Sequence, residues 1–211
     1  MTVVRDPILQ SVPIMTLRPT QMTVGMREVR EKLKSWRSHG AKKKFEFLTK
    51  HAIPVIQGSK GRLYIVDHHH LARALHEAGI KDVVVMVFRD LSGISKKSFW
   101  TFLDHHGWVY PYDANGRRCD YKKIPRSIAE LKDDPYRSLA GELRRIGGFA
   151  KDTTPFSEFL WADFLRETLG KASIENQYNS AIKKAYKLAK SSKANYLPGW
   201  CGPVGALKQN M

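Results

Sequence analysis

Residues 63–79, LYIVDHHHLARALHEAG, contain the pattern that decides the fold. The apolar run LYIV predicts a buried β-strand. After the histidines, apolar residues recur at helical spacing until Gly79, a residue that commonly ends helices; they are Leu71, Ala74, Leu75 and Ala78. Upstream, IPVIQ at 53–57 and the turn residues GSKG at 58–61 add a second strand. The stretch therefore predicts a β-hairpin that leads directly into a helix.

The flanking sequence extends this unit in both directions. VVVMVF at 83–88 is apolar at every position, so we place this strand centrally in a sheet. Residues 12–17, VPIMTL, predict a first strand that ends before Pro19. Residues 26–37, MREVREKLKSWR, predict an amphipathic helix that Gly40 terminates.

Beyond Asp90 strand patterns stop and helical patterns follow. Helices are expected from Ser95, after the Asp134-Pro135 pair, after Thr154-Pro155, and from Ser173. The Gly- and Pro-rich end of the chain predicts an irregular tail. We therefore expect an α+β protein, with a small mixed β-sheet and helices in a domain at 1–92. An all-helical domain with the tail would occupy 93–211.

Composition narrows the possible protein classes. The 211 residues are 42% hydrophobic, which is ordinary for a globular chain and argues against wholesale disorder. No run of 18 apolar residues exists, so no membrane helix or membrane partner is expected. The N-terminus lacks the order of a signal peptide, which favours a cytoplasmic protein. Two cysteines exclude a disulfide scaffold and a four-cysteine zinc site.

The positive charge is concentrated toward the two ends of the chain. Lys and Arg number 36 against 20 Asp and Glu, a net charge of +16. Residues 1–100 contribute +10, residues 101–170 contribute zero and residues 171–211 contribute +6. Such a charge attracts polyanions, so we expect nucleic acid, with DNA favoured over RNA, or a nucleotide as partner. The alternative is that the lysines only keep the chain soluble.

The histidine turn is the main candidate site. His68, His69 and His70 lie where a strand meets a helix, and the free N–H groups of a helix start suit phosphate. The imidazoles could donate to phosphate, act as general acid or base, or bind a metal. Alternatively, Asp67 is only the helix N-cap and the histidines are exposed residues of the first turn.

Four segments together resemble the ParB/sulfiredoxin-like superfamily, and within it the group of ParB-like nucleases. They are LRPTQ at 17–21, the hairpin at 53–67, the histidine box and VVVMVFRDLS at 83–92; the tail segment NYLPGW also fits the group. The resemblance implies that the mixed sheet carries a phosphate site. It further implies a nuclease, or a nucleotide-dependent phosphotransfer enzyme, that acts on nucleic acid or a nucleotide. The alternative is a non-catalytic nucleic-acid or nucleotide-binding module.

The resemblance also implies roles for individual residues. It places Arg18 on phosphate, with Asp67, His69 and His70 beside it as catalytic candidates. Family members usually have glycine at the position of His68 and arginine at that of Leu71. His68 and Arg73 are additional candidate phosphate ligands, and the alternative for Arg73 is a solvated helix residue. A catalytic base is expected in the first helix. Glu28 lies nearest the expected position, and Glu31 is the second candidate. Asp67 is the candidate ligand for a divalent ion, Mg²⁺ or Mn²⁺.

Further basic residues suggest a nucleic-acid surface. One group lies near tyrosines 110, 112 and 121, which could stack on bases; it comprises Arg117, Arg118, Lys122 and Lys123. A second group forms a helical stripe of Lys183, Lys187 and Lys190. Both groups could equally be solvated surface. His105 and His106 could join His69 at a metal, or could simply be cations at a helix end.

Overall fold

The computed structural model describes residues 8–203, so the first seven and last eight residues of the two expected domains lie outside it. Their contacts form two compact units, with boundaries after Val24, Glu28 and Asp133. The sheet unit comprises the described residues up to 24 together with 29–133. The helical unit comprises 25–28 and the described residues from 134 onward.

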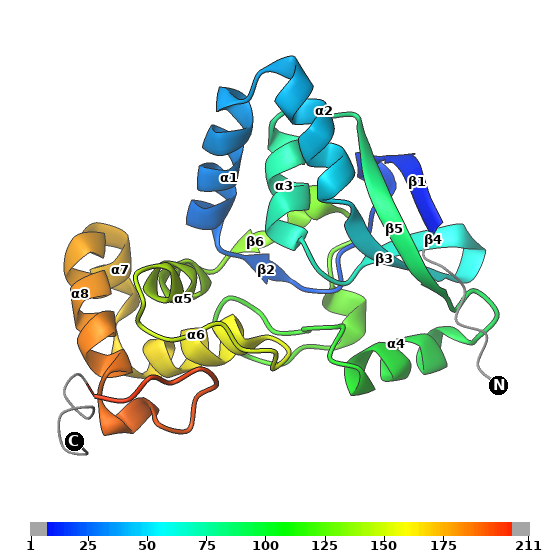
Figure 1. Ribbon diagram of the computed structural model, residues 1–211. Helices are drawn as coiled ribbons and strands as arrows, with labels where there is room; N and C mark the ends of the chain where they lie inside the picture. The colour runs from blue at the N-terminus through cyan, green and yellow to red at the C-terminus, as the bar shows by residue number, and fades with distance from the viewer. Residues whose placement is uncertain (1–7, 204–211) are drawn as a thin grey trace, which may run out of the picture. The chain divides into compact units, whose positions relative to one another are not determined.

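A four-stranded mixed sheet forms the centre of the sheet unit (Figure 1). Its order is β1-β5-β3-β4, from the strands β1 (Ile8–Pro13), β3 (Ile53–Gly58), β4 (Arg62–Ile65) and β5 (Asp82–Asp90). β5 pairs antiparallel with β1 and parallel with β3, while β3 and β4 form the expected hairpin. The central place of residues 83–88 is thereby confirmed.

The first strand lies earlier in the chain than we expected. β1 ends at Pro13, and Ile14–Thr16 form a 3-10 turn in the place of the expected strand at 12–17. The Ile14 N–H donates to the Lys81 carbonyl, while Leu17 N–H donates back to Ile14. Ile14 and Leu17 are buried through this tight turn while Met15 is exposed, and the apolar pattern of the sequence does not distinguish such a turn from a strand.

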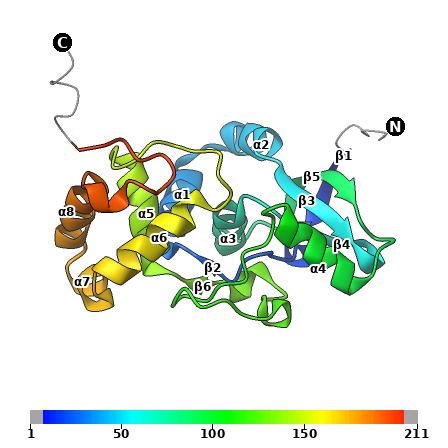
Figure 2. The same ribbon diagram turned by 90° about the horizontal axis from the view of Figure 1, so that it is seen from below.

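Helices cover the two sides of this sheet. In Figures 1 and 2, α2 (Ala41–Lys50) and α3 (His69–Glu77) lie on one side, with α1 (Met26–Ser38) beside them, and α4 (Lys96–His105) lies on the other. Buried Phe99, Trp100 and Leu103 of α4 cluster with Ile56 and Tyr64 of the sheet. Burial of this apolar surface joins residues 93–133 to the sheet unit, so the contacts change after Asp133 and not at the expected residue 92.

A second, two-stranded sheet uses residues for which we expected no strand. β2 (Thr23–Val24) pairs in parallel with β6 (Lys132–Asp133). Both are too short, and β6 is too charged, to show a strand pattern. Among the described residues, no strand of the four-stranded sheet lies beyond Asp90, as we expected from the sequence.

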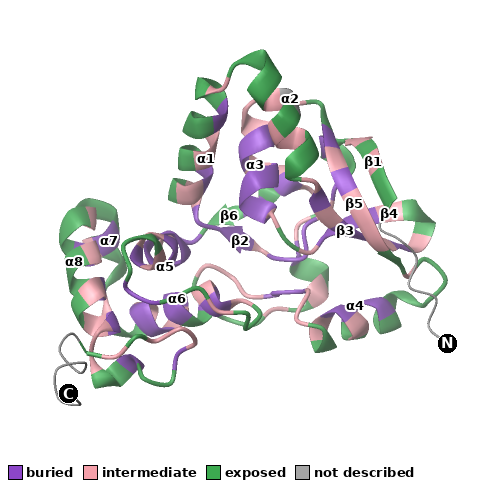
Figure 3. Ribbon diagram, in the orientation of Figure 1, coloured by how far each residue is buried: buried purple, intermediate pink, exposed green. Residues whose placement is uncertain are grey.

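The described part of the helical unit contains four helices: α5 (Pro135–Arg145), α6 (Ser157–Thr168), α7 (Lys171–Asn176) and α8 (Tyr178–Ala189). Their shared core includes Leu139, Leu143, Trp161 and Leu165. Figure 3 shows buried positions concentrated in α5 and α6, whereas α8 exposes much of its surface. The architecture is thus α+β, with a mixed four-stranded sheet and helices followed by a helical region.

The helix starts follow the expected capping chemistry only in part. The Asp134 carboxylate accepts the N–H groups of Tyr136 and Arg137, so α5 begins as predicted. α6 instead starts at Ser157, after Phe156 adopts a left-handed conformation with φ 59°. The helix expected from Ser173 is divided at Gln177 into α7 and α8, and both contribute to one core.

None of the described helices is both long enough and apolar enough to cross a membrane. After α8, a 3-10 turn at Ser192–Ala194 leads into a stretch without helix or strand up to residue 203. That stretch matches the irregular tail we expected, while residues 204–211 lie outside the described part.

Candidate phosphate site

The turn between β4 and α3 has an unusual backbone. β4 ends at Ile65, two residues before Asp67, and His68 caps α3 with φ 64° and ψ 23°. This left-handed conformation costs a non-glycine residue on the order of 1 kcal/mol, although histidine tolerates it better than most. The position at which the resembling proteins have glycine is therefore a place where the backbone itself favours glycine.

No side chain of the N-cap residue forms a capping hydrogen bond at the start of α3. The Asp67 carboxylate accepts the His68 N–H at 2.6 Å. The N-cap residue is His68, not Asp67, and its side chain accepts no hydrogen bond from the helix. The first turn of α3 contains no acidic residue. The negative charge near the positive end of the helix dipole is thus that of Asp67, one residue before the N-cap.

His69 is a buried structural group. Only 4% of the residue is exposed, and its Nε2 accepts the backbone N–H of Thr20 at 3.1 Å. An acceptor nitrogen carries no proton, so the imidazole is neutral with its proton on Nδ1. Burial lowers the pKa of His69 to about 3, and the negative charge of nearby Asp67 opposes this shift.

The alternative that the histidines are exposed residues of the first turn is wrong for His69 and His70, which are both buried. His70 is only 8% exposed. The pKa of His68 is also lowered, first by burial. Because His69 and His70 are both packed in the interior, their joint replacement by alanine would disturb the fold, whereas exposed first-turn residues would have been removed at little cost.

The LRPT segment, Leu17 to Thr20, lies beside the same turn. Arg18 pairs with β4 through its backbone, since its N–H donates to Leu63 and its carbonyl accepts from Ile65. The Thr20 hydroxyl donates to the Ile65 carbonyl at 2.7 Å. The structure therefore brings the backbone of Arg18 next to the strand that leads into the histidine turn.

Two basic residues that we did not select from the sequence act on His68. Lys32 of α1 and His51, just after α2, both lower the pKa of His68 through their positive charge. His51 Nδ1 bonds the Phe47 carbonyl at 2.9 Å, and its ring stacks on Phe47. In the sequence, Lys32 looked like one of many charges on an outer helix face, so only the packing of α1, α2 and α3 reveals it.

One polar atom at the turn has no protein partner. His68 Nδ1 is buried, and no hydrogen-bond partner for it exists among the described residues. A buried nitrogen of this kind costs about 1–3 kcal/mol when it is left unsatisfied. A ligand at the start of α3 could satisfy it.

Asp67 offers one carboxylate for a divalent ion. In the described part of the chain, no three His, Cys, Asp or Glu side chains gather as a metal-binding group; this includes His105 and His106. Mg²⁺ commonly binds one or two carboxylates, with substrate phosphates and water supplying its other ligands. The exposed Asp67 fits that pattern, but it does not form a protein cage for a metal.

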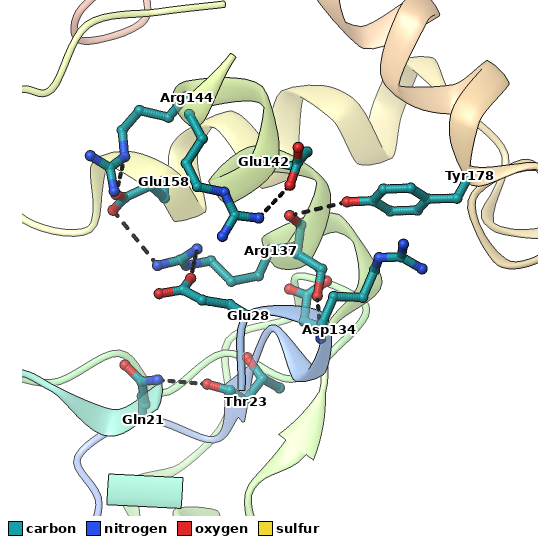
Figure 4. A network of polar contacts seen from close by, with 12 residues as sticks. Gln21, Thr23, Glu28, Asp134, Arg137, Glu142, Arg144, Glu158 and Tyr178 are labelled. Atoms are coloured by element: carbon teal, nitrogen blue, oxygen red, sulfur yellow. Dashed lines mark hydrogen bonds and ion pairs between the residues drawn. The ribbon is translucent and has the colours of Figure 1, made fainter. Parts of the chain in front are cut away.

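Glu28, the candidate base, belongs to the helical unit. Its carboxylate lies 3.3 Å from Nη1 of Arg137, a residue that is only 8% exposed (Figure 4). Arg137 also approaches Glu158, which pairs with Arg144 at 2.9 Å. Glu28 thus helps to compensate a buried guanidinium, a structural task that the first-helix position alone did not indicate.

Arg73 also has structural partners in place of the expected phosphate. Its Nε donates to Glu77 at 2.8 Å, one turn further along α3. Its Nη1 lies within hydrogen-bonding distance, 2.8–3.2 Å, of three backbone carbonyl oxygens, those of Ile128, Ala129 and Leu131. The guanidinium therefore ties α3 to the 3-10 turn Ile128–Glu130.

The basic residues proposed for nucleic acid differ in their surroundings. Arg118 pairs with Asp104 at 2.6 Å, and Tyr121 donates to the same carboxylate. Tyr121 also stacks on Trp100, while Tyr110 is buried, so these rings are already engaged. The remaining members of that group, Arg117, Lys122 and Lys123, are exposed.

On α8 the lysine stripe lies opposite the buried face. Ala181, Ala185 and Ala189 pack into the core, whereas Lys183 and Lys187 are exposed. Lys190 differs from them, because its Nζ donates to the Gly147 carbonyl at 2.9 Å.

Comparison with known proteins shows the family to which the chain is similar. Residues 10–167 match the family described as "Putative ParB-like nuclease". The chain is 45% identical to protein Atu1540 from Agrobacterium tumefaciens, whose crystal structure it resembles with a TM-score of 0.87, over 93% of this chain and 99% of that one. No curated protein matches.

A more distant structural match is the C-terminally truncated chromosome-partitioning protein ParB from Caulobacter crescentus, complexed with CTP-γ-S. Identity is 15% and the TM-score is 0.33, over 87% of this chain and 97% of that one.

Proposed function

Because the chain belongs to the family described as "Putative ParB-like nuclease", we propose that it binds a phosphate of nucleic acid or a nucleotide at the start of α3. The reaction proposed there is phosphodiester hydrolysis, as in a nuclease, or nucleotide-dependent phosphotransfer. The observation that carries the proposal is the left-handed His68 turn, which opens a helix whose first turn contains no acidic residue.

Helix-start and basic groups at the turn favour an anion, and the Asp67 carboxylate opposes it. A helix start is equivalent to roughly half a positive charge. Lys32 adds positive charge that acts on His68, although the negative charge of Asp67 acts on it more strongly. Backbone N–H groups at a helix start can then bond phosphate oxygens without help from a charged side chain. Arg18 supports the site from the neighbouring LRPT segment, whose backbone is paired with β4.

Catalysis at this turn would depend on Asp67 more than on the histidines. His69 uses Nε2 to accept Thr20 N–H, so it is a poor candidate to exchange protons with a substrate. Asp67 is exposed, and only one hydrogen bond to its carboxylate, from His68, is seen in the described structure. It could accept a proton from an attacking water, or hold Mg²⁺ or Mn²⁺ against the phosphate.

The second candidate is a binding module without turnover. Two observations favour it, namely the structural use of the His69 imidazole and the apolar, buried Leu71 at the position where arginine is usual. Arginine would supply paired hydrogen bonds to phosphate that leucine does not. Phosphate binding would then rest on the helix start, Arg18 and the basic surroundings.

Replacement Asp67→Asn distinguishes the two candidates. If the protein is an enzyme, this change should reduce turnover of labelled DNA or a nucleotide by about 10²–10⁴-fold, the usual contribution of an acid or base. Activity is measured on a panel of nucleotides and labelled DNA, with and without Mg²⁺ or Mn²⁺. Asp82→Asn, at an exposed carboxylate that begins β5, is the matched control.

Each outcome of the Asp67→Asn experiment has a different consequence for the proposal. Turnover that survives Asp67→Asn would contradict the assignment of Asp67. Binding without turnover under every condition would favour the module, and absence of binding would remove the proposal itself.

The charge of +16 predicts a steep salt dependence of DNA binding. If six to ten phosphates are contacted, affinity should fall by roughly 10³–10⁵-fold between about 50 and 200 mM salt. Lys183→Ala with Lys187→Ala should reduce the salt slope by about 1 for each lysine that contacts a phosphate. The measurement is fluorescence anisotropy of a labelled duplex over a salt series.

The control is Lys42→Ala with Lys43→Ala, an equal loss of exposed charge on α2. An equal change of slope in both variants would show that only net charge matters. Binding that does not depend on salt would contradict the nucleic-acid surface.

A further inference from the structure

We infer that His69 is a positioning residue, whose Nε2 holds the LRPT segment against the first turn of α3 and thereby places Arg18 for phosphate. This inference rests on the proposed phosphate site and assigns His69 no contact with the ligand. It is carried by the hydrogen bond between Thr20 N–H and His69 Nε2, which joins residues 49 positions apart in the sequence.

The need for this bond follows from the sequence of the segment. Arg18 is the last residue that pairs with β4 through its N–H. The next residue is Pro19, which has no N–H to donate. The backbone donor that follows is Thr20, and its partner is a side chain of α3 and not a strand. The segment that carries Arg18 is thus held by β4 before the proline and by His69 after it.

Thr20 is anchored from several directions. Its hydroxyl donates to the Ile65 carbonyl at 2.7 Å, and its own carbonyl accepts the Tyr110 N–H at 2.9 Å. Thr20 is 1% exposed, so water is a poor substitute for any of these partners. Among these anchors His69 is the one that belongs to α3, whose start forms the proposed phosphate site.

The consequence is a fixed separation between two parts of that site. The Arg18 segment and the helix start come from distant parts of the chain, and phosphate binding requires both to be in place before the ligand arrives. Without an acceptor at the position of Nε2, the Thr20 N–H would be buried without a partner. The segment would then move to satisfy it, and Arg18 would move with it.

Two variants of His69 separate positioning from packing. His69→Gln presents a carbonyl oxygen at a distance from the backbone similar to that of Nε2, so it keeps an acceptor. His69→Leu keeps an apolar body but has no acceptor. Each is made in the wild-type chain and in the chain with Arg18→Ala. Thermal melts set a temperature at which every variant is folded.

Binding is measured calorimetrically with inorganic pyrophosphate and with a short DNA duplex. His69→Leu should weaken binding of a probe by tenfold or more, whereas His69→Gln should restore it to within about threefold. In the Arg18→Ala chain, His69→Leu should add little, because the residue it positions is already gone.

A spectroscopic readout tests the bond directly. In the ¹⁵N-labelled wild-type protein, a coupling across the hydrogen bond should connect the Thr20 amide nitrogen with the imidazole Nε2 of His69. In His69→Leu the Thr20 amide should exchange with deuterium faster, while the amide of Val85 in the central strand keeps its rate. If His69→Leu does not fold, His69→Asn replaces it, since its shorter side chain does not reach the position of Nε2.

The results that overturn the inference differ from those that overturn the proposed function. A wild-type protein that binds neither probe removes the proposed phosphate site, and the positioning role with it. A wild-type protein that binds, beside an acceptor-free variant of equal affinity, removes the positioning role alone. The same holds if that variant weakens binding equally with and without Arg18, or if no coupling is seen.

Discussion

Acidification from pH 7 to pH 5 is expected to lower the free energy of unfolding by about 2 kcal/mol through His69 alone. Burial lowers the pKa of His69 from 6.5 to about 3 in the folded protein. The unfolded chain therefore binds a proton at a higher pH than the folded chain does. Stability from this group is complete above the unfolded pKa near 6.5, and it is lost as the pH falls toward the folded value near 3.

Urea unfolding of the wild-type protein and His69→Gln, at intervals from pH 7 to pH 5, measures this contribution. Glutamine does not titrate, so the variant should lack that part of the pH dependence, while the smaller effect of His68, whose pKa is also lowered, remains in both. Equal pH dependence in the two proteins would contradict the lowered pKa of His69.

Replacement Trp161→Ala should lower the free energy of unfolding by about 3–5 kcal/mol. Trp161 is fully buried in the core of the helical unit, and its ring stacks on Phe149 with centroids 4.2 Å apart. Its Nε1 also donates to the Pro198 carbonyl at 2.8 Å. Alanine would leave a cavity and would remove a bond that holds the irregular tail to α6.

Trp161→Phe is the matched control, because it retains an aromatic ring but not the donor. Its loss of stability should be clearly smaller, and urea unfolding of both variants gives the comparison. Limited proteolysis should cut near residue 198 sooner in both variants than in the wild-type protein. A change below about 1 kcal/mol in Trp161→Ala would mean that the tail and the α6 core are not packed as described.

The sequence by itself determined the elements whose signals are local. The hairpin of β3 and β4, the central place of β5 and the start of α5 after Asp134 were all predicted from neighbouring residues. Hydrophobic periodicity, turn residues and caps act within one element, so they can be interpreted without knowledge of the partner. The position of the histidine turn between β4 and α3 followed from the same signals.

Boundaries that depend on packing could not be predicted in this way. α4 follows the sheet with no further strand pattern, yet its apolar side chains cluster with Ile56 and Tyr64 of the sheet. The sequence shows that α4 has an apolar face but not which surface that face covers. The change of contacts after Asp133, and not at residue 92, is therefore a property of the tertiary structure.

Only the tertiary structure decided what the candidate side chains do. Thr20 and His69 are 49 residues apart, Arg73 and Ala129 are 56 apart, and Glu28 and Arg137 are 109 apart. A histidine, arginine or glutamate has the same chemistry in sequence whether it meets a ligand or another part of the chain. Its burial and its hydrogen-bond partner set its charge and its availability, and both are determined only when distant segments pack together.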